Sequence, residues 1–398
     1  MSDETSGQRA AHLVLSDGRY FSGQAMGAGT RVTGEVVFTT SMTGYQEALT
    51  DPSFAGQILT MTFPLQGNYG VTSYNNESDR IHARGFVVRE LTELPSHRNS
   101  IMTLDTFLAN QNILALTGVD TRSLTRHLRS SGVLMGTITV DETVEEAVHR
   151  LRMEPDYVMG NYVEEVTSTS IHQYAASDKL SKSEGIVSGD SPHIVLLDLG
   201  VKNNIMRLLE ARGCRITVVP HNTDAAGIAN LTPDGILLSP GPGDPELLGD
   251  VTETVRSLVG SAPILGICLG HQVVAKAFGA TTYKMKFCHR GANHPVIDTV
   301  TGQVYITSQN HGFAVDAAGL SADIEVTQVH LNDDSVEAME HRTEPVFTLQ
   351  YHSEASPGPN DTEYIFDKLD FILCCSLDSV AVSNADIALY KIIAAGVS

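Results

Sequence analysis

Basic residues are scarce in this chain of 398 residues, in which 26 lysines and arginines stand against 47 aspartates and glutamates. The formal net charge is therefore −21 at pH 7. A surface of this sign repels phosphate backbones and anionic lipid headgroups. The composition argues against nucleic-acid and membrane partners, and it carries no information about the fold.

Long apolar runs are also missing. The first twelve residues, MSDETSGQRAAH, are polar and lack the apolar segment of a secretory signal. A membrane span needs a run of roughly 18 apolar residues, and the sequence contains none. We therefore expect a cytoplasmic protein with no membrane-spanning segment.

Cysteine is rare, and its spacing is irregular. An odd number of cysteines without a pattern indicates a reducing compartment and no disulfide framework. No C-x-x-C pair occurs, and Cys268 and Cys288 do not form a known zinc spacing with His271 and His289. The sequence predicts no metal site. The cysteines are Cys214, Cys268, Cys288, Cys374 and Cys375.

Phosphate-binding motifs are absent as well. There is no G-x-x-x-x-G-K-[ST] loop, and no G-x-G-x-x-G opens a helix after a strand. The stretch GPGDPELLG carries the glycines but is interrupted by prolines. We expect no nucleotide cofactor on this chain.

The first part of the chain is β-rich, with a turn signal at Asp17-Gly18 that predicts a hairpin. A helix is expected from a cap at Asp120 to Gly132. Thr143 and Glu146 have the spacing of a capping box at the start of another helix. We assign residues 1–164 to an α+β N-terminal domain.

Residues 165–192 lose periodicity and gain serine and threonine, which predicts a linker or an extended segment that crosses the surface. From His193 to residue 368, apolar strands alternate with helices. This pattern predicts an α/β domain with an open, mostly parallel sheet flanked by helices on both faces. Ligands bind such sheets at the carboxyl ends of the strands.

The segment Gly266-Ile267-Cys268-Leu269-Gly270 is the thiol form of the G-x-S-x-G nucleophile elbow. A helix that starts at the cysteine stabilises a thiolate there. The backbone N–H of Leu269 follows the nucleophile and is placed to hold an oxyanion. The alternative is a buried structural cysteine at a tight turn.

Two histidines compete as the base. His271 lies within the first turn of the helix, and we expect it to pack locally, because an elbow's base normally comes from elsewhere in the chain. We expect the strand from Val346 to end at His352, with Glu354 two residues on and on the same face. Glu354 would then orient His352. The alternative is an ordinary ion pair at a strand end.

The loop SPGPGDP, residues 239–245, follows another predicted strand and exposes the backbone of Gly241 and Gly243. Gly241 is a candidate second oxyanion donor. The alternative is a plain turn.

The motifs GICLGHQ, SPGPGDP and the late His-x-Glu resemble those of the triad-type, class I glutamine amidotransferases. The stretches GEVVFTTSMTGYQEALTDPS, HRGANHPV, SQNHGFAVD and EASPGP are similar to the small-subunit family of carbamoyl phosphate synthetase. The resemblance covers roughly residues 12–368. Its N-terminal part discriminates, because other amidotransferases of this class lack it.

The resemblance implies that Cys268, His352 and Glu354 hydrolyse L-glutamine, with Gly241 and Leu269 holding the oxyanion. Ammonia would pass to a large subunit that uses ATP and Mg²⁺ to make carbamoyl phosphate for arginine and pyrimidine synthesis. No cofactor is implied on this chain. Glutamine-binding residues carried over by motif position are Ser53, Gly241, Gly243, Leu269, Gln272, Asn310, Gly312 and Phe313.

The sequence departs from the family at Pro240, where Asn is usual, at Cys288, where Gly is expected, and at Ser353, where Pro is usual. Residues 369–398 resemble nothing in the family, and we leave them as a tail of unknown role. Two other functions stay open: a free-standing cysteine amidohydrolase, and a non-catalytic scaffold that keeps the fold.

Overall fold

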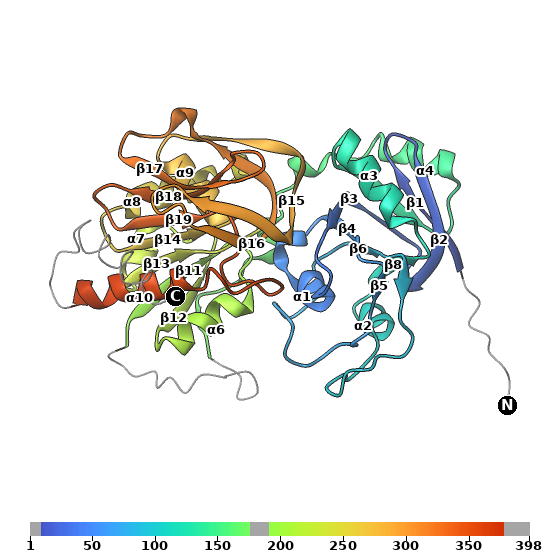
Figure 1. Ribbon diagram of the computed structural model, residues 1–398, viewed down its shortest axis with the longest axis horizontal. Helices are drawn as coiled ribbons and strands as arrows, with labels where there is room; N and C mark the ends of the chain where they lie inside the picture. Colours follow the sequence, from blue (N-terminus) through green and yellow to red (C-terminus); the bar gives the residue numbers. More distant parts are fainter. Residues whose placement is uncertain (1–8, 176–190, 378–398) are drawn as a thin grey trace. The chain divides into compact units, whose positions relative to one another are not determined.

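A computed structural model describes residues 9–175 and 191–377 of the chain (Figure 1). The chain divides into two compact units, one up to Gly160 and one from Asn161. No helix within the described residues is long and apolar enough to span a bilayer.

The first unit is built on a closed barrel with the strand order β1-β2-β8-β6-β4-β3-β9. The predicted hairpin is present, since β1 and β2 pair antiparallel across Asp17-Gly18. A separate two-stranded sheet joins β5 (Leu65–Gln66) to β7 (Glu90–Leu91). The barrel strands are β1 (Arg9–Leu15), β2 (Tyr20–Gly27), β3 (Arg31–Thr39), β4 (Gln57–Met61), β6 (Gly85–Val87), β8 (Leu114–Thr117) and β9 (Leu134–Thr139).

The helices of this unit begin where the sequence signals place them. Helix α3 starts after a cap at Asp120 and ends before Gly132, and helix α4 has the predicted capping box between Thr143 and Glu146. Both predictions are confirmed. The helices are α1 (Tyr45–Thr50), η1 (Pro52–Phe54), α2 (Leu104–Asn110), α3 (Thr121–Ser131), α4 (Val144–Leu151) and η2 (Tyr157–Met159).

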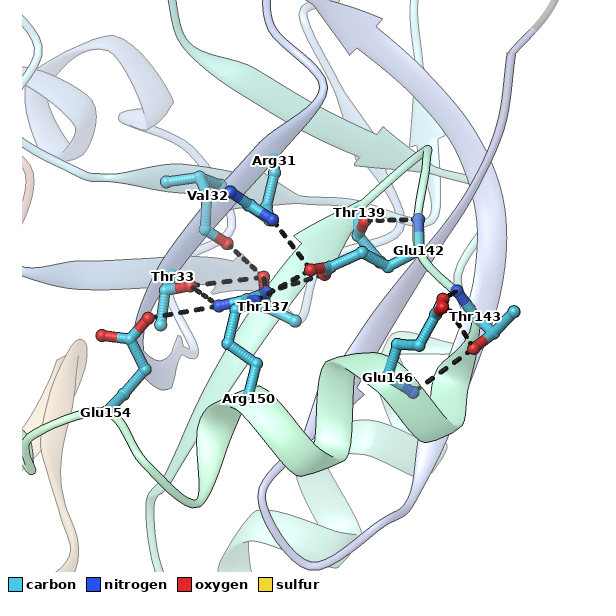
Figure 2. A network of polar contacts seen from close by, with 10 residues as sticks. All are labelled: Arg31, Val32, Thr33, Thr137, Thr139, Glu142, Thr143, Glu146, Arg150 and Glu154. Atoms are coloured by element: carbon cyan, nitrogen blue, oxygen red, sulfur yellow. Dashed lines mark hydrogen bonds and ion pairs between the residues drawn. The ribbon is translucent and has the colours of Figure 1, made fainter.

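Helix α4 is tied to the barrel by one arginine. Arg150 makes two hydrogen bonds to the carboxylate of Glu142 and also donates to Thr33 and Thr137 on strands β3 and β9 (Figure 2). Hydrogen bonds from Arg150 outweigh the cost of desolvation and lower the pKa of Glu142 to about 2. The network fixes helix α4 against strands β3 and β9 of the barrel.

The second unit contains a ten-stranded sheet among the described residues, with the order β10-β12-β11-β13-β14-β19-β18-β17-β15-β16. Strands β12, β11, β13, β14 and β19 are parallel, and β18, β17, β15 and β16 extend them with antiparallel pairs. The strands are β10 (His172–Gln173), β11 (His193–Asp198), β12 (Arg215–Pro220), β13 (Gly235–Leu238), β14 (Ile264–Ile267), β15 (Thr281–Asp298), β16 (Val304–Asp316), β17 (Ile324–His330), β18 (Val336–His341) and β19 (Val346–Leu349).

Helices cover both faces of the parallel strands, as the continuous apolar strands predict. Along β11, Ile194 and Leu196 face a cluster with α6 and α10, whereas Val195 and Leu197 face a cluster with α8 and α9. The α/β fold class is confirmed. The helices are α5 (Val163–Val166), α6 (Asn203–Ala211), α7 (Ala225–Ala229), η3 (Pro245–Leu247), α8 (Gly249–Leu258), α9 (Leu269–Ala277), η4 (Ala317–Gly319) and α10 (Tyr364–Leu377).

The predicted linker, residues 165–192, is partly ordered structure of the second unit. It contains the end of α5 and the strand β10, which pairs antiparallel with β12. Polar residues at a sheet edge satisfy their backbone groups in this way without an apolar period, so the pattern gave no strand signal. Residues 176–190 lie outside the described part.

Two further boundaries differ from expectation. Strand β19 ends at Leu349 rather than His352, because the chain then leaves its neighbours and His352 bridges to Ser308 instead. The boundary at 368 falls inside helix α10, whose Leu369, Ile372 and Leu373 are buried in the core. The tail therefore starts as a core helix, and residues 378–398 lie outside the described part.

Candidate active site

Cys268 lies at the point where strand β14 turns into helix α9. Its backbone has φ 53° and ψ −105°, a strained conformation for a residue with a side chain. Its N–H donates to the carbonyl of Leu349, and its carbonyl accepts the first helical hydrogen bond from Gln272. The helix begins at Leu269, so the cysteine itself occupies the N-cap position, as the elbow motif predicts.

The two glycines of the elbow are required by close contacts. A Cβ on Gly266 would lie 2.8 Å from the carbonyl oxygen of Gly270, and a Cβ on Gly270 would lie 2.4 Å from that of Leu238. Such distances are too short for any side chain. The G-x-C-x-G motif therefore needs both glycines because strand, turn and helix pack so closely around the cysteine.

His352 and Glu354 form a buried pair beyond the end of β19. The Nδ1–H of His352 donates to Oε1 of Glu354 over 2.7 Å, and both side chains are at most 2% exposed. The Nε2 atom has no nitrogen or oxygen partner among the described residues, and the Cys268 thiol interacts with this ring. The three predicted residues are thus brought together, although not by a continuous strand.

Neighbouring charges shift the pKa of His352 upward and the pKa of Glu354 downward. Burial alone would lower the pKa of His352, but Glu354 and then Cys268 outweigh it and raise this pKa to about 10. Burial alone would raise the pKa of Glu354, but Lys202 and then His352 lower it to about 2. An imidazolium beside a carboxylate and a sulfur atom is the stable form at neutral pH.

Lys202 is a buried cation that the sequence analysis did not single out. Its Nζ lies 3.1 Å from Oε1 of Glu354, and it also donates to the carbonyl of Ala355. Nearby, Asn204 donates to the carbonyl of Glu354 over 2.6 Å. The available signal was its position in the short loop between β11 and α6, at the carboxyl end of a parallel strand.

His271 makes its hydrogen bond to strand β19 and not to the triad residues. Its Nδ1 lies 2.8 Å from Oγ1 of Thr348 on β19, and burial lowers its pKa to about 3. The ring is fully buried. This placement agrees with the local packing role expected from the sequence.

The loop after β13 lies against the elbow. A Cβ on Gly241 would be 2.1 Å from the carbonyl oxygen of Leu199 and 2.8 Å from Cδ2 of Leu269. The two candidate oxyanion donors, Gly241 and Leu269, are therefore neighbours. Gly243 has φ 94°, which favours glycine at that point of the turn.

Three of the candidate glutamine-binding residues, Asn310, Gly312 and Phe313, belong to strand β16, and the first of them contacts Cys268. The Cys268 Sγ lies 3.7 Å from the carbonyl of Asn310. The amide nitrogen of Gln272 donates to the carbonyl of Phe313 and to Oε1 of Gln350, so this side chain braces the site. Gly312 stands between these residues, with the Cys288 sulfur 3.4 Å from where its Cβ would be.

Ser53 belongs to the first unit, in the short helix η1. Its N–H donates to the Asp51 carboxylate, which caps that helix. Its buried hydroxyl has no hydrogen-bond partner among the described residues. Its assignment to glutamine binding stays a prediction.

The three departures from the family have distinct surroundings. Cys288 has φ 65° in an irregular part of β15, a conformation that suits the expected glycine. Pro240 accepts a hydrogen bond from Ser239 through its carbonyl and has no N–H to donate. Ser353 is fully buried next to His352, and its hydroxyl has no partner within the described ranges.

Comparison with known proteins agrees with this architecture. Residues 195–371 match the family model of class I glutamine amidotransferases, which defines the class of the second unit. Residues 13–138 match the small-chain domain of carbamoyl-phosphate synthase.

Full-length relatives extend the match over both units. The carbamoyl phosphate synthase small chain of Syntrophotalea carbinolica is 47% identical over 90% of this chain and 96% of its own length. That of Akkermansia muciniphila is 47% identical over 89% and 95%. The pyrimidine-specific small chain of Bacillus subtilis is 45% identical over 89% and 94%. The chain belongs to the family of carbamoyl phosphate synthase small chains.

Proposed function

We propose that this chain hydrolyses L-glutamine with a Cys268-His352-Glu354 triad and supplies ammonia for carbamoyl phosphate synthesis. The observation that carries the proposal is the buried pair of His352 and Glu354, 2.7 Å apart, beside a cysteine held in a strained elbow. Nucleophile, base and orienting group are the parts that covalent amide hydrolysis needs.

The first half of the reaction forms a thioester. The Cys268 sulfur attacks the side-chain amide carbon of glutamine, and the negative charge moves to the amide oxygen. The backbone N–H groups of Gly241 and Leu269, two residues that lie close together, would stabilise this oxyanion. His352, charged at neutral pH, gives its Nε2 proton to the departing nitrogen, and ammonia leaves.

The second half regenerates the thiolate. His352, now neutral, takes a proton from water, and the resulting hydroxide attacks the thioester carbon. The C–S bond breaks and glutamate leaves. Throughout, Glu354 holds Nδ1 and keeps Nε2 directed at the reacting atoms, and Lys202 keeps Glu354 ionised.

The partner is proposed to be a large synthetase subunit that binds ATP and Mg²⁺ and receives the ammonia in a hetero-oligomer. The family of small chains supports this assignment, as does the sequence, which has no phosphate loop. The carbamoyl phosphate would serve arginine and pyrimidine synthesis. The free cysteines among the described residues fit a cytoplasmic setting.

Reconstitution with the large subunit tests the proposal. Cys268→Ala should abolish glutamine-dependent carbamoyl phosphate synthesis and leave synthesis from free ammonia largely intact. Loss of both activities would contradict the division of labour between the chains. Fast glutamine hydrolysis by the isolated chain, with no stimulation by the large subunit and ATP, would favour a free-standing amidohydrolase. Failure of a covalent glutamine analogue to label Cys268 would favour a scaffold.

A further inference from the structure

A group of four histidines, outside the proposed triad, belongs to three antiparallel strands. These strands, β15, β16 and β17, are labelled in Figure 1. His289 is at its centre. Its ring stacks on His330 with 4.3 Å between centroids and meets His311 edge-on at 5.1 Å. His294 completes the group, and the fully buried Glu337 reaches it from β18.

Two polar atoms face each other inside this group without hydrogen bonds. Nδ1 of His289 and Oε1 of Glu337 are 3.9 Å apart, and neither has a hydrogen-bond partner among the described residues. The side chains are 6% and 0% exposed. Leaving such buried atoms without hydrogen bonds is unfavourable, so their shared orientation points to a ligand between them.

The surrounding hydrogen bonds leave lone pairs directed inward. Nε2 of His289 lies 2.9 Å from the Asp333 carboxylate, which accepts, so Nδ1 carries no proton in the neutral ring. Nδ1 of His311 lies 2.7 Å from the carbonyl of Phe313, and its Nε2 lies 2.6 Å from Oε1 of Gln309. Both oxygens can only accept, so with the proton on Nδ1 the Nε2 lone pair faces a second lone pair, an arrangement that a cation would relieve. Gln309 donates to Oε2 of Glu337 and keeps Oε1 free. Metal-binding histidines and carboxylates have outer partners of this kind.

We propose that Nδ1 of His289, Nε2 of His311 and Oε1 of Glu337 bind a divalent transition-metal ion of the zinc class. The ligand atoms of these residues lie within 4.8 Å of one another. Two neutral imidazoles and one carboxylate suit Zn²⁺, with each ligand atom about 2.0–2.2 Å from the ion. A water molecule would complete a tetrahedron.

A cation also offsets the charge problem of Glu337. A fully buried carboxylate is costly unless a cation or hydrogen bonds compensate for its charge, and the side chain of Glu337 is 0% exposed. The ion would join β15, β16 and β18 and would fix Phe313, whose carbonyl binds both His311 and Gln272. The site is structural, because none of its ligands belongs to the triad.

A second triplet, His289, His294 and His330, is also close enough to share an ion. There, however, Nδ1 of His294 and Nε2 of His330 already hydrogen-bond to each other over 3.0 Å. Oε1 of Glu337, which has no hydrogen-bond partner among the described residues, belongs only to the first set, which we therefore choose. This inference departs from the sequence expectation of no metal site, because residues 289, 311 and 337 follow no short spacing rule.

The test is a metal titration of the purified full chain, first stripped with a chelator. A Cys268→Ser background removes the active-site thiol as a competing ligand. We expect one equivalent of Zn²⁺ with a dissociation constant in the micromolar range or below, and a tetrahedral Co²⁺ absorption band without thiolate character. E337Q should weaken binding at least 100-fold, and D333N roughly 10- to 100-fold. H294Q, the matched control, should leave it within threefold.

The direct titration of the background protein decides the proposal even where a variant fails to fold. Absence of stoichiometric binding at 100 micromolar Zn²⁺ overturns it. Binding that survives E337Q but is lost in H294Q also overturns it and assigns the ion to the other triplet. Zn²⁺ should raise the melting temperature of the background protein and not that of E337Q, provided that circular dichroism shows E337Q to be folded.

Discussion

Nζ of Lys202 and Oε1 of Glu354 are 3.1 Å apart with both side chains almost completely buried. The same oxygen accepts the Nδ1 proton of His352, so one carboxylate atom joins a permanent cation to the proposed base. A buried charge needs such a partner, since removing either member leaves the other without compensation. The proposed triad therefore depends on a fourth residue from a different strand end.

Replacing Lys202 with Met should lower glutamine hydrolysis at least tenfold and destabilise the protein by about 3–5 kcal/mol. Glu354 loses its main positive neighbour, so its pKa rises and the acid limb of the kcat profile moves to higher pH. Lys368→Met is the matched control, because Lys368 is also buried and pairs with Glu340 at 2.9 Å, outside the site. An unchanged pH profile in K202M would contradict the positioning role.

A comparison of two variants, His352→Gln and His271→Gln, should show which histidine is the base and which one only packs in the core. H352Q should reduce kcat by about 10³-fold or more, the scale seen when one member of a catalytic triad is lost. H271Q should keep kcat within a few-fold and cost stability instead, because His271 only binds Thr348 in the core. Steady-state kinetics with thermal melts measure both effects. Comparable kcat losses in the two variants would disprove the assignment.

Adding a methyl group inside the elbow should disrupt it. In Gly270→Ala the new Cβ would lie 2.4 Å from the carbonyl oxygen of Leu238, and backbone cannot easily move away. We expect destabilisation of more than about 2 kcal/mol and loss of labelling at Cys268. Gly249→Ala on α8 is the control, since nothing lies within 4 Å of its added Cβ. A G270A protein as stable as G249A would refute the packing argument.

Stability should fall on the alkaline side through His352. Its pKa is about 10 in the folded protein and about 6.5 when unfolded, so folding binds a proton that the unfolded chain lacks. The resulting stabilisation is complete below about pH 6.5 and is lost as the pH rises through about 10, at up to about 1.4 kcal/mol per pH unit. Denaturant unfolding of wild type and H352Q between pH 6 and 10 measures this. Parallel curves would speak against the raised pKa.

Local signals predicted the parts of the structure that local energetics control. Asp120, Thr143 and Gly132 mark helix ends because their own side chains or backbone freedom satisfy the helix termini. The elbow was visible because Gly266 and Gly270 stand at fixed positions around Cys268. These features need no knowledge of distant residues.

Features set by tertiary contacts were missed or placed incorrectly. Lys202 becomes a partner of Glu354 only when β11 and the segment after β19 meet at one edge of the sheet. His352 leaves the strand because Ser308, far away in sequence, offers it a different backbone partner. The His289, His311 and Glu337 group has the same cause: three strands bring together residues without any common spacing.

Helix α10 has a consequence for how the second unit is made. Leu373 packs against Gly235, and neighbouring residues of this helix cover Ile194 and Leu196 on β11, the first parallel strand of the unit to be synthesised. This face of β11 therefore stays uncovered during synthesis until α10 has left the ribosomal exit tunnel. Folding of this unit on the ribosome should therefore finish late. Its intermediate should expose apolar surface and be prone to aggregation unless a chaperone binds it.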